Sequence, residues 1–269
     1  TVARLLVGLY EPTRGGLTFD GQDAHAAFKS SNAKAMRKRI QMIFQDPYAS
    51  LNPRWTVEDI VGEPLHEHGL IQDEQELKDR VAELLQSVGL SALDMVKYPH
   101  QFSGGQRQRI SIARALATAP EFLVCDEPTS ALDVSVQAQI LNLLQDMKER
   151  YGLTLIFISH DLAVVKAVST RIMVMYLGKI CEIATPEALY SKPAHHYTKA
   201  LLDSVPIADP TRQKITELLQ GEPPSPMNPP TGCRFRTRCH AATLRCAEQE
   251  PQLREVSPGQ FVACHHPIV

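Results

Sequence analysis

The sequence has no apolar run that approaches the roughly 20 residues required by a membrane-spanning helix. It has no secretory signal, and it begins with Thr1, inside a predicted helix whose natural start we expect to lie upstream. It also has little excess of charge, with a formal net charge of −2. These absences argue against a membrane-embedded chain, an exported disulfide-stabilised protein and an electrostatically driven nucleic-acid binder.

The composition is that of a globular protein, and its predicted elements alternate. Hydrophobic residues make up 43% and charged residues 22% of the 269 residues, which suits one large domain or one domain with an appendage. Short apolar runs typical of buried strands alternate with amphipathic helix patterns, which indicates an α/β fold with parallel strands. The predicted helices span 2–10, 73–88, 103–118 and 134–150, and the predicted strands span 17–20, 40–45, 121–126, 153–159, 171–176 and 179–183.

A change in composition near residue 206 divides the chain. Residues 221–230 contain five prolines and cannot form regular structure. We therefore expect a main domain over 1–205, a proline-rich linker over 206–230 and a small cysteine-rich tail over 231–269.

Two adjacent acids, Asp126 and Glu127, follow the apolar run 122–125. Ligands of open α/β sheets bind at the carboxyl ends of strands, where these acids are expected. One carboxylate can hold Mg²⁺ and the other can polarise an attacking water. Taken alone, the pair is better explained as a solvated acidic turn.

A glycine pair opens the predicted helix 103–118, in the order Ser103, Gly104, Gly105, Gln106. Glycines let backbone amides approach an anion closely, and the helix N-terminus adds partial positive charge. Ser103 can cap the helix and also donate to a phosphate oxygen. The alternative is an ordinary serine-capped helix.

Two further polar residues lie at the ends of predicted strands. Gln45 is the last residue of the strand at 40–45 and can reach a metal or its water ligands, while His160 follows the strand at 153–159 and can contact a terminal phosphate. Each has a plain alternative, a polar strand end for Gln45 and a backbone-bonded loop histidine for His160.

Together, these signals resemble an ABC ATPase. The strings FSGGQRQR from Phe102 and DEPTS from Asp126 carry the resemblance, which covers residues 1 to about 205. It implies an α/β, P-loop NTPase-like ABC ATPase domain, with a parallel-sheet core and a helical signature subdomain at about 52–118. The parts it implies are the Q-loop Gln45, the signature motif Ser103, Gly104, Gly105 and Gln106, the Walker B Asp126, the catalytic Glu127, the D-loop ending at Asp133 and the switch His160.

The resemblance also implies a mechanism and partners. Two ATPase subunits, alike or different, close head to tail around ATP, with Asp126 and Gln45 at Mg²⁺, Glu127 activating water and His160 at the γ-phosphate. The other implied partners are two transmembrane permease subunits and, indirectly, an extracytoplasmic peptide-binding protein. The implied location is the cytoplasmic face of the prokaryotic plasma membrane.

One part of the family pattern is not in the sequence. No G-x-x-x-x-G-K-[ST] phosphate-binding string occurs anywhere, and Thr1 aligns with the residue that would follow it. We therefore expect residues 1–269 alone to be inactive as an ATPase and prone to aggregate.

Four of the six cysteines lie in the tail, at Cys233, Cys239, Cys246 and Cys264. By resemblance to the C-terminal extension of oligopeptide and dipeptide transporter ATPases, they are expected to bind a [4Fe–4S] cluster, with Zn²⁺ or unligated thiols as alternatives. Cys125 is expected to be a core thiol, like the remaining cysteine in the strand at 179–183.

The same resemblance makes peptides the leading imported substrate. Relatives that import nickel or glutathione are the alternative. Two rival readings are a non-transport ABC ATPase of DNA repair or translation, and a non-catalytic assembly partner. The sequence has neither the insertions expected of a DNA-repair ATPase nor the tandem cassettes expected of a translation factor, which argues against a non-transport ABC ATPase. Nucleotide binding by the bare chain tests whether it is a non-catalytic assembly partner.

Overall fold

The structure is a computed structural model that describes residues 1–205 and 221–268. The chain divides into two compact units, unit 1 (Thr1–His160) and unit 2 (Asp161–Val269). The predicted linker falls partly on residues 206–220, which lie outside the described residues, and residues 221–230 contain no helix or strand.

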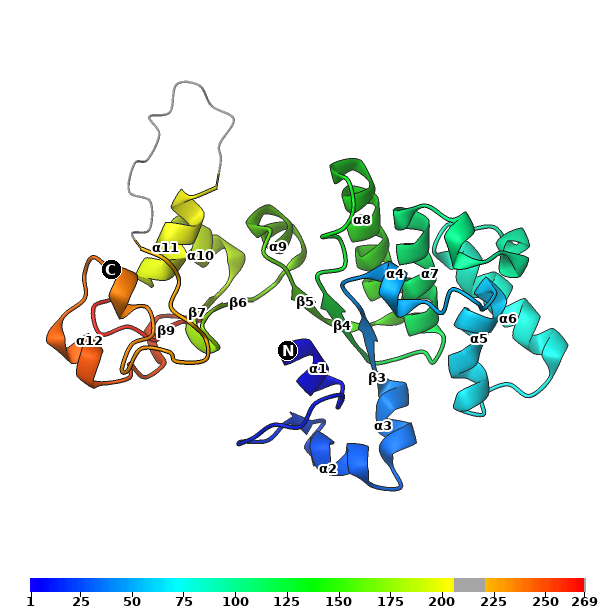
Figure 1. Cartoon of the computed structure of the whole chain (residues 1–269), viewed down its shortest axis with the longest axis horizontal. Helices are drawn as coiled ribbons and strands as arrows, with labels where there is room; N and C mark the ends of the chain where they lie inside the picture. Colours follow the sequence, from blue (N-terminus) through cyan, green and yellow to red (C-terminus); the bar gives the residue numbers. More distant parts are fainter. Residues whose placement is uncertain (206–220, 269) are drawn as a thin grey trace. The chain divides into compact units, whose positions relative to one another are not determined.

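Unit 1 contains a parallel sheet with the predicted order of elements (Figure 1). Its helices are α1 (Val2–Leu6), α2 (Ala24–Lys29), α3 (Ala33–Arg39), α4 (Pro47–Ser50), α5 (Val57–Glu67), α6 (Glu74–Ser87), α7 (Gly104–Leu116) and α8 (Val134–Tyr151), with 3₁₀ turns η1 (Ala92–Val96) and η2 (Pro99–Gln101). Its strands are β1 (Thr18–Phe19), β2 (Gln22–Asp23), β3 (Ile40–Ile43), β4 (Phe122–Asp126) and β5 (Thr154–Ile158).

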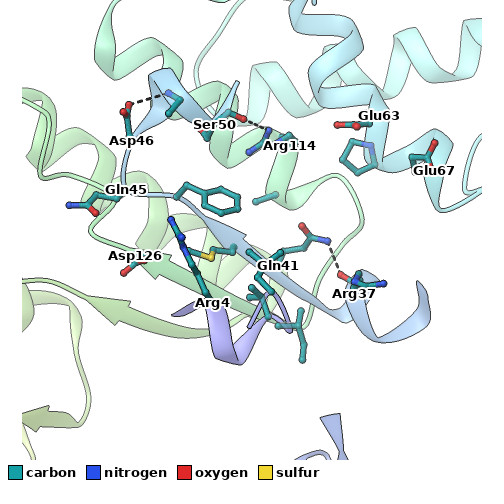
Figure 2. A pocket seen from close by; sticks show the side chains of 18 of the residues that line it. Arg4, Arg37, Gln41, Gln45, Asp46, Ser50, Glu63, Glu67, Arg114 and Asp126 are labelled. Atoms are coloured by element: carbon teal, nitrogen blue, oxygen red, sulfur yellow. Dashed lines mark hydrogen bonds between the residues drawn. The ribbon is translucent and has the colours of Figure 1, made fainter. Parts of the chain in front are cut away.

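The order β3-β4-β5 and its register bring three strand ends together. All three strands run parallel, with Ile43 opposite Cys125 and Cys125 opposite Phe157. The chain therefore leaves the sheet at one shared edge after each strand. Figure 2 shows Gln45 and Asp126 at that edge, where β3 and β4 end.

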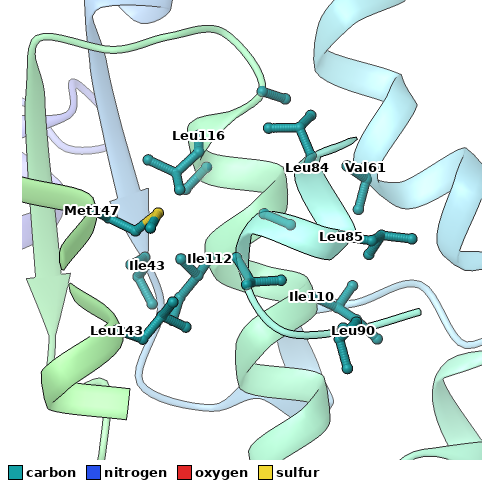
Figure 3. Packing of buried hydrophobic residues seen from close by; sticks show 14 of the residues in the cluster. Ile43, Val61, Leu84, Leu85, Leu90, Ile110, Ile112, Leu116, Leu143 and Met147 are labelled. Carbon is teal, nitrogen blue, oxygen red and sulfur yellow. The ribbon is translucent and has the colours of Figure 1, made fainter. Parts of the chain in front are cut away.

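The largest apolar cluster of unit 1 joins the sheet to the helices that follow it. Leu84 and Leu85 of α6 pack with Ile110 and Ile112 of α7, and this cluster also takes in Ile43 of β3 (Figure 3). Asp73 caps α6 by accepting from the amides of Gln75 and Glu76. The cluster holds α5, α6 and α7 together as a helical group beside the sheet.

Unit 2 is built around an antiparallel sheet in the order β6-β7-β9-β8. Its elements are α9 (Leu162–Val168), β6 (Ile172–Tyr176), β7 (Lys179–Ala184), α10 (Pro186–Ser191), α11 (His196–Asp203), η3 (Arg236–Arg238), α12 (Leu244–Glu248), β8 (Arg254–Ser257) and β9 (Gln260–Val262). The tail strand β9 thus pairs with β7 of the main domain, so the predicted tail shares a sheet with it.

Candidate functional site

Three side chains from three strand ends meet at one carboxylate oxygen. The amide Nε2 of Gln45 donates to Oε2 of Glu127 at 3.0 Å. The ring Nδ1 of His160 lies 3.3 Å from the same oxygen. Glu127 is largely covered, with 25% of its side chain exposed, whereas His160 is 75% exposed. The structure therefore brings together Gln45, Glu127 and His160, although Gln45 lies 82 residues before Glu127 in the sequence.

The backbone of Glu127 turns sharply where β4 ends. Its φ of 48° lies in the left-handed region that non-glycine residues rarely adopt. Its N–H donates to the carbonyl of Ile158 at 3.0 Å, which continues the pairing of β4 with β5. The hydroxyl of Ser130 donates to its carbonyl at 3.1 Å. These bonds hold a conformation that otherwise costs about 1–2 kcal/mol.

Asp126 precedes this turn and lines a cavity of about 690 Å³ in unit 1. The cavity lies among β3, α4, α5 and α7, and Figure 2 shows Gln45 and Asp126 on its sheet side and Glu63 and Glu67 of α5 on its helix side. Gln45 thus contacts Glu127 and also lines this cavity.

The SGGQ segment forms the beginning of α7. Ser103 is the N-cap, and its hydroxyl accepts from the amide of Gln106 at 3.3 Å, while the Gln106 side chain accepts from the Ser103 amide at 3.0 Å. Ser103 and Gln106 are exposed, and Gly104 and Gly105 are partly exposed. The predicted serine cap is present, and the motif lies at the surface of unit 1.

The two glycines approach the segment that follows Glu127. A Cβ on Gly105 would lie 2.4 Å from Cγ1 of Val136, and a Cβ on Gly104 would lie 3.5 Å from Cδ2 of Leu132. Asp133, between these two residues, caps α8 by accepting from the Val136 amide at 3.0 Å. A hydrogen bond from the Ser135 hydroxyl lowers the pKa of Asp133 below its usual value. The signature and D-loop segments are therefore in direct packing contact.

The four tail cysteines lie in unit 2 as free thiols, at Cys233, Cys239, Cys246 and Cys264. Burial, with a smaller contribution from the charges of the other three, raises the pKa of Cys264 to about 11. Among residues 1–205 and 221–268, however, no group of three or more His, Cys, Asp or Glu side chains is arranged to hold a metal ion. The four thiols are therefore not arranged as an iron–sulfur or zinc site in the structure.

The two remaining cysteines are buried, as predicted for core thiols. Burial raises the pKa of Cys125 in β4 and of Cys181 in β7 to about 12 each. Both thiols stay protonated at neutral pH, because their pKa values lie far above it.

One buried carboxylate, Glu182 of β7, is not among the residues predicted from the sequence. It is fully buried and accepts from the amides of Ala194 and His195, both at 2.9 Å, and from the side-chain amide of Gln260 at 2.8 Å. The only signal in the sequence is a lone acid within an apolar strand. Glu182 joins β7, the start of α11 and the tail strand β9.

Comparisons with known proteins match both parts of the chain. The profile described as "ABC transporter" matches residues 1–130, and the one described as "Oligopeptide/dipeptide transporter, C-terminal region" matches 181–246. AppF, an oligopeptide transport ATP-binding protein of Bacillus subtilis, is 50% identical over 98% of this chain and 81% of its own length. YkfD of the same organism, provisionally described in the same terms, is 54% identical with the same coverage.

The chain belongs to the family of ABC transporter ATP-binding proteins.

Solved ABC structures agree with this assignment. The ATP-binding cassette MJ0796, a dimer bound to ADP and phosphate, has a TM-score of 0.62 and 29% identity, and covers 69% of this chain and 79% of its own. The cbiO1 protein of Clostridium perfringens, part of the ABC transporter complex cbiONQ, has the same TM-score with 27% identity, and covers 71% and 74%. The predicted α/β ABC ATPase fold is confirmed, and this ABC protein is an ATPase by family. No helix in the part of the chain that the structure describes is long and apolar enough to cross a membrane.

Proposed function

We propose that this ABC protein is the ATP-hydrolysing subunit that powers import of peptides across the prokaryotic plasma membrane, at its cytoplasmic face. The observation that carries the proposal is the single Glu127 oxygen that meets both Gln45 and His160. The substrate class follows from relatives that are named for oligopeptide transport or peptide import and are about half identical over nearly the whole chain. Nickel and glutathione import find no counterpart among these names.

Glu127 is the proposed base of the hydrolysis. Its carboxylate takes a proton from water as the water oxygen bonds to the γ-phosphorus, and the bond from that phosphorus to the β-phosphate oxygen breaks, leaving ADP and phosphate. The amide of Gln45 orients the carboxylate by donating to it. His160, largely exposed beside it, donates to the γ-phosphate.

The oxygen donors at the strand ends fit a magnesium ion. Asp126 offers a carboxylate and Gln45 an amide oxygen, both on the lining of the same cavity, and oxygen ligands are those that Mg²⁺ prefers. These two residues would hold the ion, which neutralises phosphate charge when bound.

The SGGQ segment is the proposed contact with nucleotide held by a second ATPase subunit, identical or different. Its support is the exposed Ser103 at the start of a 13-residue helix, where unpaired amides and the helix dipole favour phosphate. Asp133 caps the neighbouring α8 and lies beside the SGGQ segment in the proposed dimer surface.

Two permease subunits complete the proposed transporter, served indirectly by an extracytoplasmic peptide-binding protein. The 690 Å³ cavity supports this part, because it combines an apolar floor, including Met42 and Phe44, with charged residues such as Arg37 and Glu67. Gln45 also lines it, so a permease segment seated there would contact the residue that orients Glu127.

The deciding experiment compares Glu127→Gln with the wild type in the whole gene product, assembled with its permease in vesicles. We expect turnover to fall about 10²–10⁴-fold, because the base is lost, with ATP affinity unchanged. Glu149→Gln, an exposed carboxylate on α8, is the matched control. Normal turnover in Glu127→Gln refutes the role of Glu127. Uptake of nickel or glutathione but not of peptides refutes the substrate class.

The tail cysteines are a separate part of the proposal. We infer that Cys233, Cys239, Cys246 and Cys264 bind a [4Fe–4S] cluster, with Zn²⁺ as the alternative, after their thiols turn toward a common centre. The support is that the charges of all the other three raise the pKa of Cys264. Iron, sulfide and zinc analysis of anaerobically purified protein tests this, with Cys239→Ser as the variant that should lose the metal. Protein free of all three refutes it.

A further inference from the structure

The helix α4 is tied to Gln45 by the chain between them. Asp46 caps α4 by accepting from the amides of Tyr48 at 2.7 Å and Ala49 at 3.3 Å, and Pro47 occupies the first helical position. The cap and the fixed φ of proline leave little freedom over this short segment. A displacement of Gln45 therefore displaces Tyr48.

Tyr48 in turn contacts the signature helix α7. The guanidinium carbon of Arg107 lies 3.9 Å from the centre of the Tyr48 ring, well within the range of a cation–π contact. Arg107 is held there by a 2.7 Å bond from its Nε to the carbonyl of Pro99. The Tyr48 hydroxyl lies 3.8 Å from the place that a Cβ on Gly104 would take. The ring therefore packs against the start of the SGGQ helix, although 58% of Tyr48 is exposed.

A second contact joins the other end of α4 to the same helix. Nη1 of Arg114 donates to the carbonyl of Ser50 at 2.7 Å. Arg107 and Arg114 are seven residues apart, which places them two turns apart on one side of α7. Two points of attachment fix the orientation of α4 on α7, as well as its distance.

The body of α7 is held by apolar packing. Figure 3 shows Ile110, Ile112 and Leu116 among side chains that include Leu84 and Leu85 of α6. Since packed cores do not deform continuously, α7 moves with its neighbours as a unit. A movement of α4 is therefore passed to the SGGQ segment.

We propose that Tyr48 and Arg107 are positioning residues that couple Gln45, and through it the Glu127 carboxylate, to the SGGQ segment of the same chain. The coupling rests on the proposed function, in which SGGQ contacts nucleotide held by the partner subunit. Through this coupling, the arrangement of Gln45 and Glu127 in one hydrolytic site sets the position of the SGGQ segment of the same chain. That segment completes the hydrolytic site of the partner subunit. Neither residue touches the reacting atoms.

A double-mutant cycle tests the coupling without nucleotide. Native-state hydrogen exchange is measured at the amides of Gln106 and Arg107, which donate to Ser103 at the start of α7. We expect Gln45→Ala to lower protection there by up to about fivefold in the wild type, the loss equivalent to one cation–π contact, and to have no further effect in Tyr48→Leu. Tyr98→Leu, which removes a ring stacked on His100, is the matched control and should leave the effect of Gln45→Ala unchanged. Equal effects in wild type and Tyr48→Leu overturn the proposal.

Turnover supplies the second readout, in the transporter assembled with its permease. We expect Tyr48→Leu to lower kcat about threefold to fivefold with the ATP dissociation constant unchanged, and Tyr48→Phe, which keeps the ring, to restore kcat. A change in ATP affinity in place of kcat means that Tyr48 contacts nucleotide and overturns the positioning role. If the wild type hydrolyses no ATP, the proposed function fails, and the exchange cycle still decides the coupling.

Discussion

The close approach of Gly105 to Val136 predicts that Gly105→Ala destabilises unit 1. A Cβ at residue 105 would lie 2.4 Å from Cγ1 of Val136, while the next nearest atom is 3.7 Å away. The clash is with a single methyl group, but χ1 of a β-branched residue in a helix has one favoured rotamer, so the methyl cannot turn aside freely. The helices α7 and α8 must separate, or Val136 must leave its rotamer.

The magnitude follows from two opposing effects. Overpacking of this kind costs about 1–3 kcal/mol. Replacing glycine by alanine within a helix returns up to about 1 kcal/mol, less here because Gly105 lies in the first turn. We therefore expect the free energy of unfolding of unit 1 to fall by about 1–2 kcal/mol.

Urea unfolding followed by the fluorescence of Trp55 measures this directly. Trp55 is the single tryptophan of the chain and lies in unit 1, so the signal reports the unit that is perturbed. The matched control is Val136→Ala, which removes the clashing methyl. In the double variant, Gly105→Ala should be neutral or stabilising relative to Val136→Ala alone. A Gly105→Ala protein as stable as the wild type refutes the argument.

The same pair separates packing from ligand binding. If Gly105 serves only to let α7 approach α8, the double variant regains both stability and ATP turnover. If a phosphate must also approach the backbone at this point, stability returns and turnover does not. The proposed function predicts the second result, measured in the assembled transporter.

Two predictions concern unit 2. Glu182→Ala should destabilise it by at least about 3 kcal/mol, since three donors lose their acceptor at about 1–3 kcal/mol each. Hydrogen exchange in β7 and β9 should then accelerate while the Trp55 transition stays unchanged, and the exposed control Glu248→Ala should change neither. Burial lowers the pKa of His195 from 6.5 to about 4. Between pH 4 and pH 6.5, His195 is therefore protonated in the unfolded chain and neutral in the folded one. Its contribution to the free energy of unfolding of unit 2 should be fully present above pH 6.5 and should fall by about 3 kcal/mol as the pH is lowered towards 4. His195→Asn should flatten that profile, and an equally steep profile in the variant would contradict the assignment.

Much of the fold follows from local patterns in the sequence. The amphipathic runs that became α6, α7 and α8 carry their own caps, Asp73, Ser103 and Asp133, so their starts can be read to within a residue. The buried strands β3, β4 and β5 are short apolar runs followed by polar residues. Such signals need no knowledge of distant contacts.

Other features depend on contacts between distant residues and left no local signal. Glu182 has an ordinary position in an apolar strand, and its partners lie 12, 13 and 78 residues away. The contact of Tyr48 with Arg107 joins two residues that separately resemble surface side chains. The pairing of β9 with β7 also crosses the predicted linker, so composition alone separated a tail that shares a sheet with the main domain.

The geometry at Glu127 shows how sheet register turns sequence order into a site. Ile43 pairs with Cys125, and Cys125 with Phe157, so Gln45 and Glu127 each lie two residues beyond one aligned row and His160 lies three beyond it. An extended continuation of β4 would alternate the side chains of Asp126 and Glu127 between the two faces of the sheet. The left-handed turn at Glu127 interrupts that alternation, and its carboxylate reaches both neighbours. A glutamine side chain at residue 127 is compatible with this left-handed turn and still offers an oxygen that can accept from the Gln45 amide. The Glu127→Gln variant therefore changes the chemistry of the site while preserving its packing.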